Sequence, residues 1–206
     1  MIRKFSALAP VILFKRSSVK QIMEMDIHRW VHIHNPDRSA KSPAENFAWL
    51  LETYPEFRNL FYYRIGTYSS ILGRILLWLA KMLYPPVDTM RFGLSKIGPG
   101  FFIEHGFVTI IGAETIGENC WVNSGVAIGY RDQSGVPNIG NNVYIGAGAK
   151  ILGPVKIGDN VVIGANAVVL RDVPSNCTVA GVPARIIRRD GVKVKESLSA
   201  ATRQAS

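Results

Sequence analysis

An acid and an imidazole stand side by side at Glu104-His105, inside a stretch that otherwise holds mostly aliphatic, aromatic, glycine and small residues. The stretch, from 101 to 120, reads FFIEHGFVTIIGAETIGENC. An imidazole that is neutral near physiological pH can take a proton from a reacting group, and a neighbouring carboxylate can assist it. We therefore take His105 as a candidate general base with Glu104 as its helper. The alternative is a surface histidine bonded to its neighbours.

The stretch is part of a repeat with a period of six. From residue 97 onward aliphatic residues recur every six positions, with one extra residue before Ile110 and a longer gap after Ile128. A period of six matches neither a helix nor a strand and indicates a repeat architecture. The positions are Ile97, Ile103, Ile110, Ile116, Val122, Ile128, Ile139, Ile145, Ile151, Ile157, Ile163 and Val169.

Each hexad also carries a turn signal. Glycine or asparagine, which tolerate positive φ, stands at Gly100, Gly106, Asn119, Gly125, Asn142, Gly148, Asn160 and Asn166. A small or apolar residue often follows, at Cys120, Val126, Val143, Ala149, Val155, Val161 and Ala167. A short edge with a fixed corner predicts a parallel β-helix whose rungs bury their apolar rows against one another. His105 then falls at a corner or points outward.

The first part of the chain follows a helical pattern instead. Apolar residues recur three and four positions apart within 18–34, 44–54 and 58–84, and Pro85-Pro86 ends this pattern. The sequence thus predicts an N-terminal helical domain over 1–86 and a β-helix domain over 87–187. The tail over 188–206 has no periodic apolar pattern from Asp190 on and is expected to be mobile.

The composition limits the possible partners. Among 206 residues 48% are hydrophobic and 19% are charged, which supports a folded core. The net charge of +9 favours anionic partners such as phosphorylated cofactors. No basic stripe with interleaved aromatics is present, so we expect no nucleic acid partner.

Neither metal binding nor export is indicated. Cys120 and Cys177 form no metal-binding spacing, so we expect buried thiols, no metal and a cytoplasmic location. The apolar segment 71–84 is interrupted by Arg74 and Lys81 and is shorter than the roughly 20 residues of a bilayer span. We expect it to pack against the other helices. Lying on an anionic membrane surface is the alternative.

Residues 97–187 resemble the hexapeptide-repeat acyltransferases, and among them the serine acetyltransferases. The matching stretches are IGPGFFIEHG, IGAGAKILGPVKIGDNVVIGANAVVLRDVP and AGVPARII, with LLETYPEFRNLFYYRIG in the helical part. The resemblance implies a left-handed parallel β-helix, whose hand the spacing alone does not supply. It also implies transfer of an acyl group, usually acetyl, from coenzyme A to a hydroxyl.

The resemblance assigns roles to three residues. His105 falls on the family's catalytic histidine, and the acid before it is aspartate in the family and Glu104 here. In the family an aspartate in a Val-Asp pair, shortly before the first repeat, orients this histidine. Asp88, in Val87-Asp88, is the candidate for that role, although it is displaced by two residues. A helix-capping or solvated aspartate is the alternative.

The family binds acetyl-CoA in a groove between neighbouring β-helices, which implies a homotrimer. The pantetheine arm would pass Ala147 and Gly148, in IGAGAK, and Ala165, in IGANAV, where larger side chains would block it. Cationic side chains could bind the phosphates of the coenzyme A nucleotide. The alternative is that they are solvated surface cations. The candidates are Lys150, Arg171 and Arg185.

The acceptor is where the resemblance is incomplete. Residues 129–138, GYRDQSGVPN, add five residues to one hexad and are expected to close over the site, with Tyr130, Arg131 and Asp132 facing the acceptor. The family's Arg-His-Pro triplet, whose arginine holds an amino acid carboxylate, aligns with Gly135, Val136 and Pro137.

An aspartate that lines the family's serine pocket is likewise replaced, at Asn35-Pro36. Because both changes remove polar contacts to serine, we predict a sugar hydroxyl as acceptor, as in the O-acetyltransferases of polysaccharide biosynthesis. Serine is the alternative. A non-catalytic β-helix scaffold is the alternative from another class.

Overall fold

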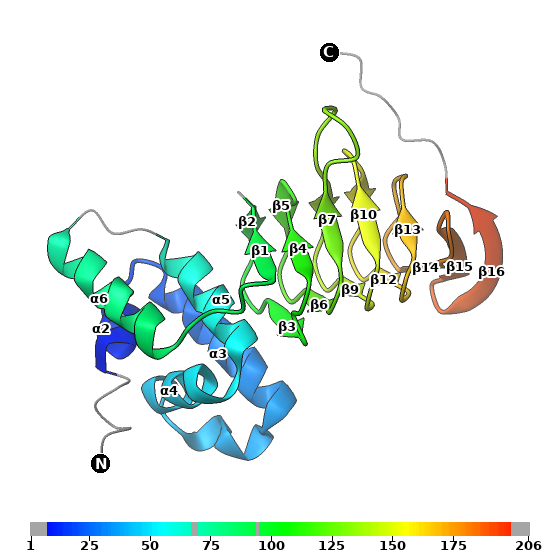
Figure 1. The fold of residues 1–206 in the computed structure, drawn as a ribbon. Coiled ribbons are helices and arrows are strands. Elements are labelled where there is room, and N and C mark those ends of the chain that lie inside the picture. Colours follow the sequence, from blue (N-terminus) through cyan, green and yellow to red (C-terminus); the bar gives the residue numbers. More distant parts are fainter. Residues whose placement is uncertain (1–7, 67–69, 94, 199–206) are drawn as a thin grey trace. The chain divides into compact units, whose positions relative to one another are not determined.

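The computed structural model describes residues 8–66, 70–93 and 95–198 (Figure 1). The chain divides into two compact units, Met1–Asp88 and Thr89–Ser206. The boundary predicted from the sequence, between 86 and 87, lies two residues earlier. Each unit is described by itself.

The first unit is helical. The predicted segments 18–34 and 44–54 each correspond to one helix, and two further helices overlap the segment 58–84. Within the described residues of the first unit the elements are α2 (Leu8–Arg16), α3 (Lys20–His34), the 3₁₀ helix η1 (Pro36–Ala40), α4 (Pro43–Thr53), α5 (Pro55–Ile65) and α6 (Ile71–Leu83).

The start of α4 shows how the sequence sets a helix boundary. The Ser42 hydroxyl accepts a hydrogen bond from the Glu45 N–H, and the Glu45 carboxylate accepts one from the Ser42 N–H. Pro43 occupies the first helical position, where its missing N–H costs nothing. The hydrogen bonds from Ser42 hold the pKa of the Glu45 carboxyl below its usual value.

Aromatic side chains fill the core of this unit. Trp30, Phe47 and Phe61 are buried, and the Phe14 ring stacks on Phe47 at 4.7 Å between centroids. A buried ion pair joins α3 to α5, with Asp26 Oδ2 and Arg64 Nε 2.9 Å apart. No helix within the described ranges is both long and apolar enough to cross a bilayer.

The second unit is a parallel β-helix with three faces (Figure 1). Sheet A holds β1 (Met90–Phe92), β4 (Thr109–Ile111), β7 (Ala127–Gly129), β10 (Lys150–Leu152) and β13 (Val168–Val169). Sheet B holds β2 (Lys96–Ile97), β5 (Thr115–Ile116), β8 (Asn138–Ile139) and β11 (Lys156–Ile157). Sheet C holds β3 (Phe102–Glu104), β6 (Trp121–Asn123), β9 (Tyr144–Ile145), β12 (Val162–Ile163), β14 (Cys177–Ala180), β15 (Arg185–Arg189) and β16 (Val192–Ser197).

The predicted period sets the register of the rungs. In sheet C the buried residues Ile103, Val122, Ile145, Ile163 and Val179 pair in succession, and comparable rows run through the other two sheets. The prediction is wrong at one position. Ile111, not Ile110, takes the inward place: the two are 0% and 50% exposed. The corner after Ile103 therefore holds one residue more than the spacing predicts.

The corners confirm most of the turn signal. The asparagines Asn119, Asn142, Asn160 and Asn166 and the glycines Gly100, Gly125 and Gly148 have φ between 55° and 72°. The positive φ predicted for Gly106 is wrong, because His105, one residue earlier, has the positive φ at this corner, at 50°. Asparagine also bonds along the coil, since Asn142 Nδ2 donates to Asn160 Oδ1 at 3.1 Å. One corner is thus stabilised from rung to rung.

The C-terminal tail departs from its prediction. Where residues 188–206 were expected to be mobile, β15 and β16 pair antiparallel with one another and β15 pairs with β14. An ion pair of 2.6 Å between Arg189 Nη2 and Glu196 Oε2 links the two strands. These strands cover the edge of the last parallel rung, which a repeat protein needs to protect. The remaining part of the predicted tail, 199–206, lies outside the described residues.

We expect the inward row of sheet C to dominate the stability of the second unit. Ile145→Ala should lower the free energy of unfolding by about 2–5 kcal/mol, because Ile145 is fully buried between rungs. Tyr144→Ala, one residue earlier on the outer face, is the matched control and should cost less than half as much. Chemical denaturation of both variants measures this. Equal losses would show that the row is not the source of the stability.

Candidate active site

His105 occupies the corner that leads from sheet C to sheet A. It follows β3 directly and its side chain is exposed, as predicted for a corner position. Within the described part of the chain, its imidazole makes no hydrogen bond or ion pair. The ring is therefore available to a ligand, to a second chain or to both.

The corner that presents His105 is tight. Val108 has a φ of 50°, a left-handed conformation that is unusual for a β-branched residue and costs on the order of 1–3 kcal/mol. Hydrogen bonds within the corner help to hold it: Phe107 N–H donates to the His105 carbonyl at 2.7 Å, and Val108 N–H donates to Thr89 Oγ1 at 3.3 Å. Backbone strain of this kind often accompanies a functional site.

Glu104 has a partner other than His105. Its carboxylate accepts a hydrogen bond from the indole N–H of Trp121 at 3.2 Å, from the neighbouring strand β6. The contact fixes Glu104 against sheet C. Its role as a helper of His105 remains a prediction.

Asp88 is the last residue of the helical unit, and its side chain is exposed. In the described ranges its carboxylate forms neither a hydrogen bond nor an ion pair. The next residue, Thr89, accepts the hydrogen bond from Val108 at the His105 corner. That Asp88 orients the imidazole remains a prediction.

The positions predicted for the pantetheine arm lie on the same column of corners as His105. Ala147 and Ala165 are exposed and Gly148 is half-buried. Since rungs are about 4.8 Å apart, Ala147 and Ala165 lie about 10 and 14 Å along the coil from the His105 corner. The bonds that join the corners run from Gly125 N to Phe107 O (2.9 Å), from Gly148 N to Ser124 O (2.8 Å) and from Asn166 N to Ala147 O (2.8 Å).

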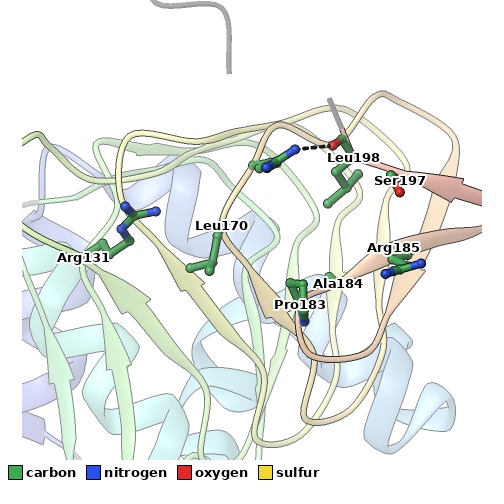
Figure 2. Close-up of a pocket in the computed structure, with 8 residues that line it drawn as sticks. Arg131, Leu170, Pro183, Ala184, Arg185, Ser197 and Leu198 are labelled. Carbon is green, nitrogen blue, oxygen red and sulfur yellow. Dashed lines mark hydrogen bonds between the residues drawn. The ribbon is translucent and has the colours of Figure 1, made fainter. Parts of the chain in front are cut away.

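Three arginines line a cavity of about 370 Å³ at the C-terminal end of the coil (Figure 2). Arg171 and Arg185, predicted to bind cofactor phosphates, both line it. Arg131 lines it as well, although the sequence assigned it to the acceptor loop. The other lining residues are Leu170, Pro183, Ala184, Ser197 and Leu198.

The last strand also contributes to this cavity, which the sequence analysis missed. Arg171 Nη1 donates to the Leu198 carbonyl at 3.1 Å, and Ser197 lines the wall. The alternation of valine with charged residues in VKVKES was the available signal for a strand there.

The loop between β7 and β8 projects from the opposite corner of sheet A (Figure 1). Tyr130 is exposed, and Asp132 Oδ1 accepts a hydrogen bond from the Ser134 N–H at 2.8 Å. The hydrogen bonds from Ser134 lower the pKa of the Asp132 carboxyl. Arg131 Nε lies 3.6 Å from Asp132 Oδ2. The three predicted acceptor residues thus share one loop, but Arg131 is directed to the arginine-lined cavity.

Gly135 suits this loop and a larger residue does not. Its φ is 133°, and a Cβ at this position would lie 3.2 Å from the Cβ of Pro154. An arginine here, as in the triplet of the resembled family, would need a different backbone.

Lys150 is engaged within the coil. Its ammonium donates to the Gly125 carbonyl at 3.0 Å and to the Gly148 carbonyl at 2.6 Å. These bonds hold two successive corners together. The geometry therefore gives Lys150 a structural task, while its predicted contact with phosphate remains untested.

In the described ranges no three His, Cys, Asp or Glu side chains gather as they would around a metal ion. Cys120 and Cys177 are buried free thiols, as the sequence predicts.

Comparison with known proteins points to one family. The family described as bacterial transferase hexapeptide (six repeats) matches residues 137–171. A serine acetyltransferase of Synechococcus elongatus is 40% identical over 174 residues, which are 75% of this chain and 71% of that protein.

Solved structures agree with this match. The Neisseria gonorrhoeae serine acetyltransferase in complex with serine superposes with a TM-score of 0.63 at 26% identity, over 85% of this chain and 72% of that one. A serine acetyltransferase in complex with CoA gives 0.61 at 31% identity, over 82% and 70% of the two chains.

The geometry of Lys150 generates a prediction. Lys150→Met should lower the free energy of unfolding by about 1–3 kcal/mol, because two carbonyl groups lose a charged donor. The affinity for coenzyme A should change little. Lys156→Met, at an exposed lysine of sheet B, is the control and should leave both quantities near wild type. Denaturation and calorimetry provide the readouts, and a large loss of coenzyme A affinity at unchanged stability would contradict this interpretation.

Proposed function

The chain belongs to the serine acetyltransferase family of hexapeptide-repeat acyltransferases, and on that premise we propose that it transfers an acetyl group from acetyl-CoA to the hydroxyl of serine. That it is an acyltransferase follows from its relatives. The observation that carries the proposal is the arrangement around sheet A. An unpartnered imidazole stands at one corner, small residues follow along the same edge, and an arginine-lined cavity lies at the end of the coil.

His105 is proposed as the general base. Its exposed imidazole accepts the proton of the acceptor hydroxyl while the hydroxyl oxygen attacks the thioester carbonyl. The imidazolium then returns that proton to the departing sulfur, which restores the base and releases coenzyme A. The tight corner fixes the backbone position of His105 before substrate arrives, so less ordering of the chain is needed during the reaction. Glu104 and Asp88 are proposed as assisting carboxylates.

Acetyl-CoA is the proposed acyl donor, and it supplies the activated thioester. Ala147, Gly148 and Ala165 leave room beside the corner column for a narrow pantetheine arm. The cavity with Arg131, Arg171 and Arg185 suits the phosphates at the other end of the molecule. A relative of known structure binds CoA, which supports this assignment.

Serine replaces the sugar that the sequence analysis preferred. The relatives and solved neighbours are serine acetyltransferases, and one of them was solved in complex with serine. They therefore favour serine, which the sequence analysis gave as the alternative acceptor. A sugar hydroxyl remains a second candidate for one reason. The Gly135-Val136 pair carries no polar side chain to hold an amino acid carboxylate, and Arg131 lies at the cavity that the proposal gives to the cofactor.

We propose a homotrimer as the functional unit. Phe107, Val108 and Ile110 are exposed apolar residues next to His105 on the single chain. A cluster of this kind suits burial against a neighbouring coil, which would close the groove over the imidazole. The cytoplasmic location and the lack of a nucleic acid partner remain predictions.

The role of His105 is tested by substitution. His105→Asn should lower kcat about 100- to 10,000-fold, because asparagine cannot accept the hydroxyl proton. Thiol release from acetyl-CoA is measured with serine and, separately, with a panel of nucleotide sugars. His32→Asn, at an exposed histidine of α3, is the control and should retain full activity.

Turnover by His105→Asn at the wild-type rate on the preferred acceptor would eliminate His105 as the base. Acetylation of a sugar but not of serine would replace the serine proposal with the second candidate. Failure of the wild-type chain to bind coenzyme A would favour the non-catalytic scaffold.

The arginine-lined cavity is tested at Arg185. Arg185→Gln should raise the KM for acetyl-CoA about tenfold, because one charged hydrogen bond to phosphate is lost. Arg188→Gln, an exposed arginine on the same strand that does not line the cavity, is the control. With S-acetylpantetheine, which lacks the nucleotide, both variants should match wild type. An equal effect on both donors would show that Arg185 does not act through the phosphates.

A further inference from the structure

The outward side of α6 is a continuous apolar surface. Ile71, Ile75, Trp78 and Met82 are 75%, 49%, 61% and 59% exposed. Their spacing of four, three and four residues places them on one side of the helix. We call these four residues the α6 outer face. Exposed leucines, Leu72 and Leu83, extend it on one flank.

The opposite side of α6 packs through small residues. Gly73 and Ala80 are buried, and α2 packs against α6 within the helical unit. The sequence analysis expected the whole segment to pack against other helices. Within the described residues of the helical unit the α6 outer face stays exposed, so that expectation was wrong for this side. A shallow hollow lined by Ile71, Arg74, Ile75 and Trp78 lies on it.

The charges near this face have one sign. Arg74 and Lys81 are seven residues apart, two helical turns, so they lie on the same flank of α6. The helix contains no aspartate or glutamate. Neither does α2, which ends in Lys15 and Arg16. The α6 outer face is therefore bordered by cations without carboxylates from either helix.

We propose that the α6 outer face binds an anionic phospholipid bilayer, with the helix lying in the plane of the interface. Isoleucine and methionine would enter the acyl boundary, and the amphipathic indole of Trp78 suits the headgroup level. Arg74 and Lys81 would meet lipid phosphates on the flank. The helix has 13 residues, whereas a span needs about 20, so a surface position is the one its length allows.

An antiparallel pair of α6 helices from two copies of this chain fits the face less well. Two α6 helices packed face to face in an antiparallel dimer would set the flank with Arg74 and Lys81 against the same flank of the partner. No carboxylate of α6 or α2 could pair with these cations. A bilayer containing anionic lipids supplies the opposite charge along the whole flank.

Vesicle flotation tests the proposal with the full chain. We expect the protein to float with vesicles of phosphatidylcholine and 30% phosphatidylglycerol, and to remain at the bottom with phosphatidylcholine alone. Because the attraction is partly electrostatic, raising NaCl from about 0.1 to 0.5 M should weaken binding.

Two double variants separate the apolar and charged contributions. Ile75→Ser with Trp78→Ser should abolish flotation, since the apolar contacts are lost. Arg74→Gln with Lys81→Gln should weaken binding about 25-fold, from roughly fivefold for each cation near an anionic surface. Val192→Ser with Lys156→Gln, at exposed positions of the β-helix, is the matched control and should bind like wild type.

The same samples are analysed for mass by light scattering and for acetyl transfer to a soluble acceptor. The proposal expects an unchanged mass and unchanged transfer in all variants, which also shows that they fold. Absence of wild-type flotation on anionic vesicles would overturn it, and so would flotation indifferent to both α6 variants. Suppose instead that the variant with Ile75→Ser and Trp78→Ser had a smaller mass than wild type, and that wild type did not bind lipid. A second copy of the chain would then be what covers the α6 outer face.

Discussion

The β-helix depends on one requirement, that each inward aliphatic side chain be covered by the residue at the same place in the next rung. Ile103, Val122 and Ile145 meet in this way along sheet C. Because each inward side chain must meet its counterpart in the next rung, the chain must turn at the same place in every hexad. Asparagine and glycine at positive φ make that turn inexpensive, and the asparagine side chains add hydrogen bonds between corners.

Departures from the period fall at corners, and the candidate active site is built from them. The corner after Ile103 is enlarged and presents His105, and the loop over 129–138 brings Arg131 to the arginine-lined cavity. An insertion at a corner leaves the inward rows in register, whereas one inside an edge would turn buried side chains outward. The coil can therefore gain chemical groups at its corners without losing its core.

The cations of this chain perform different tasks although their residue types are similar. Arg64 is buried in an ion pair with Asp26, and Lys150 joins two corners through their carbonyl groups. Arg171 and Arg185 instead share a cavity. These cations thus lie in three kinds of surroundings: a buried ion pair, the corners of the coil, and the wall of a cavity. Burial and hydrogen-bond partners, rather than charge, distinguish these roles.

The sequence by itself determined the period, the two kinds of architecture and the candidate histidine, because each rests on local spacing and residue type. It misplaced Ile110 and Gly106, since a corner of unusual length resolves only when neighbouring rungs fix the register. It also missed the last strand, whose pairing with β14 through β15 involves residues that show no hexad pattern. Only the tertiary structure gathered Arg131, Arg171 and Arg185, which are up to 54 positions apart in the sequence. The hand of the coil was supplied by family resemblance, since the spacing of inward residues is the same for either hand.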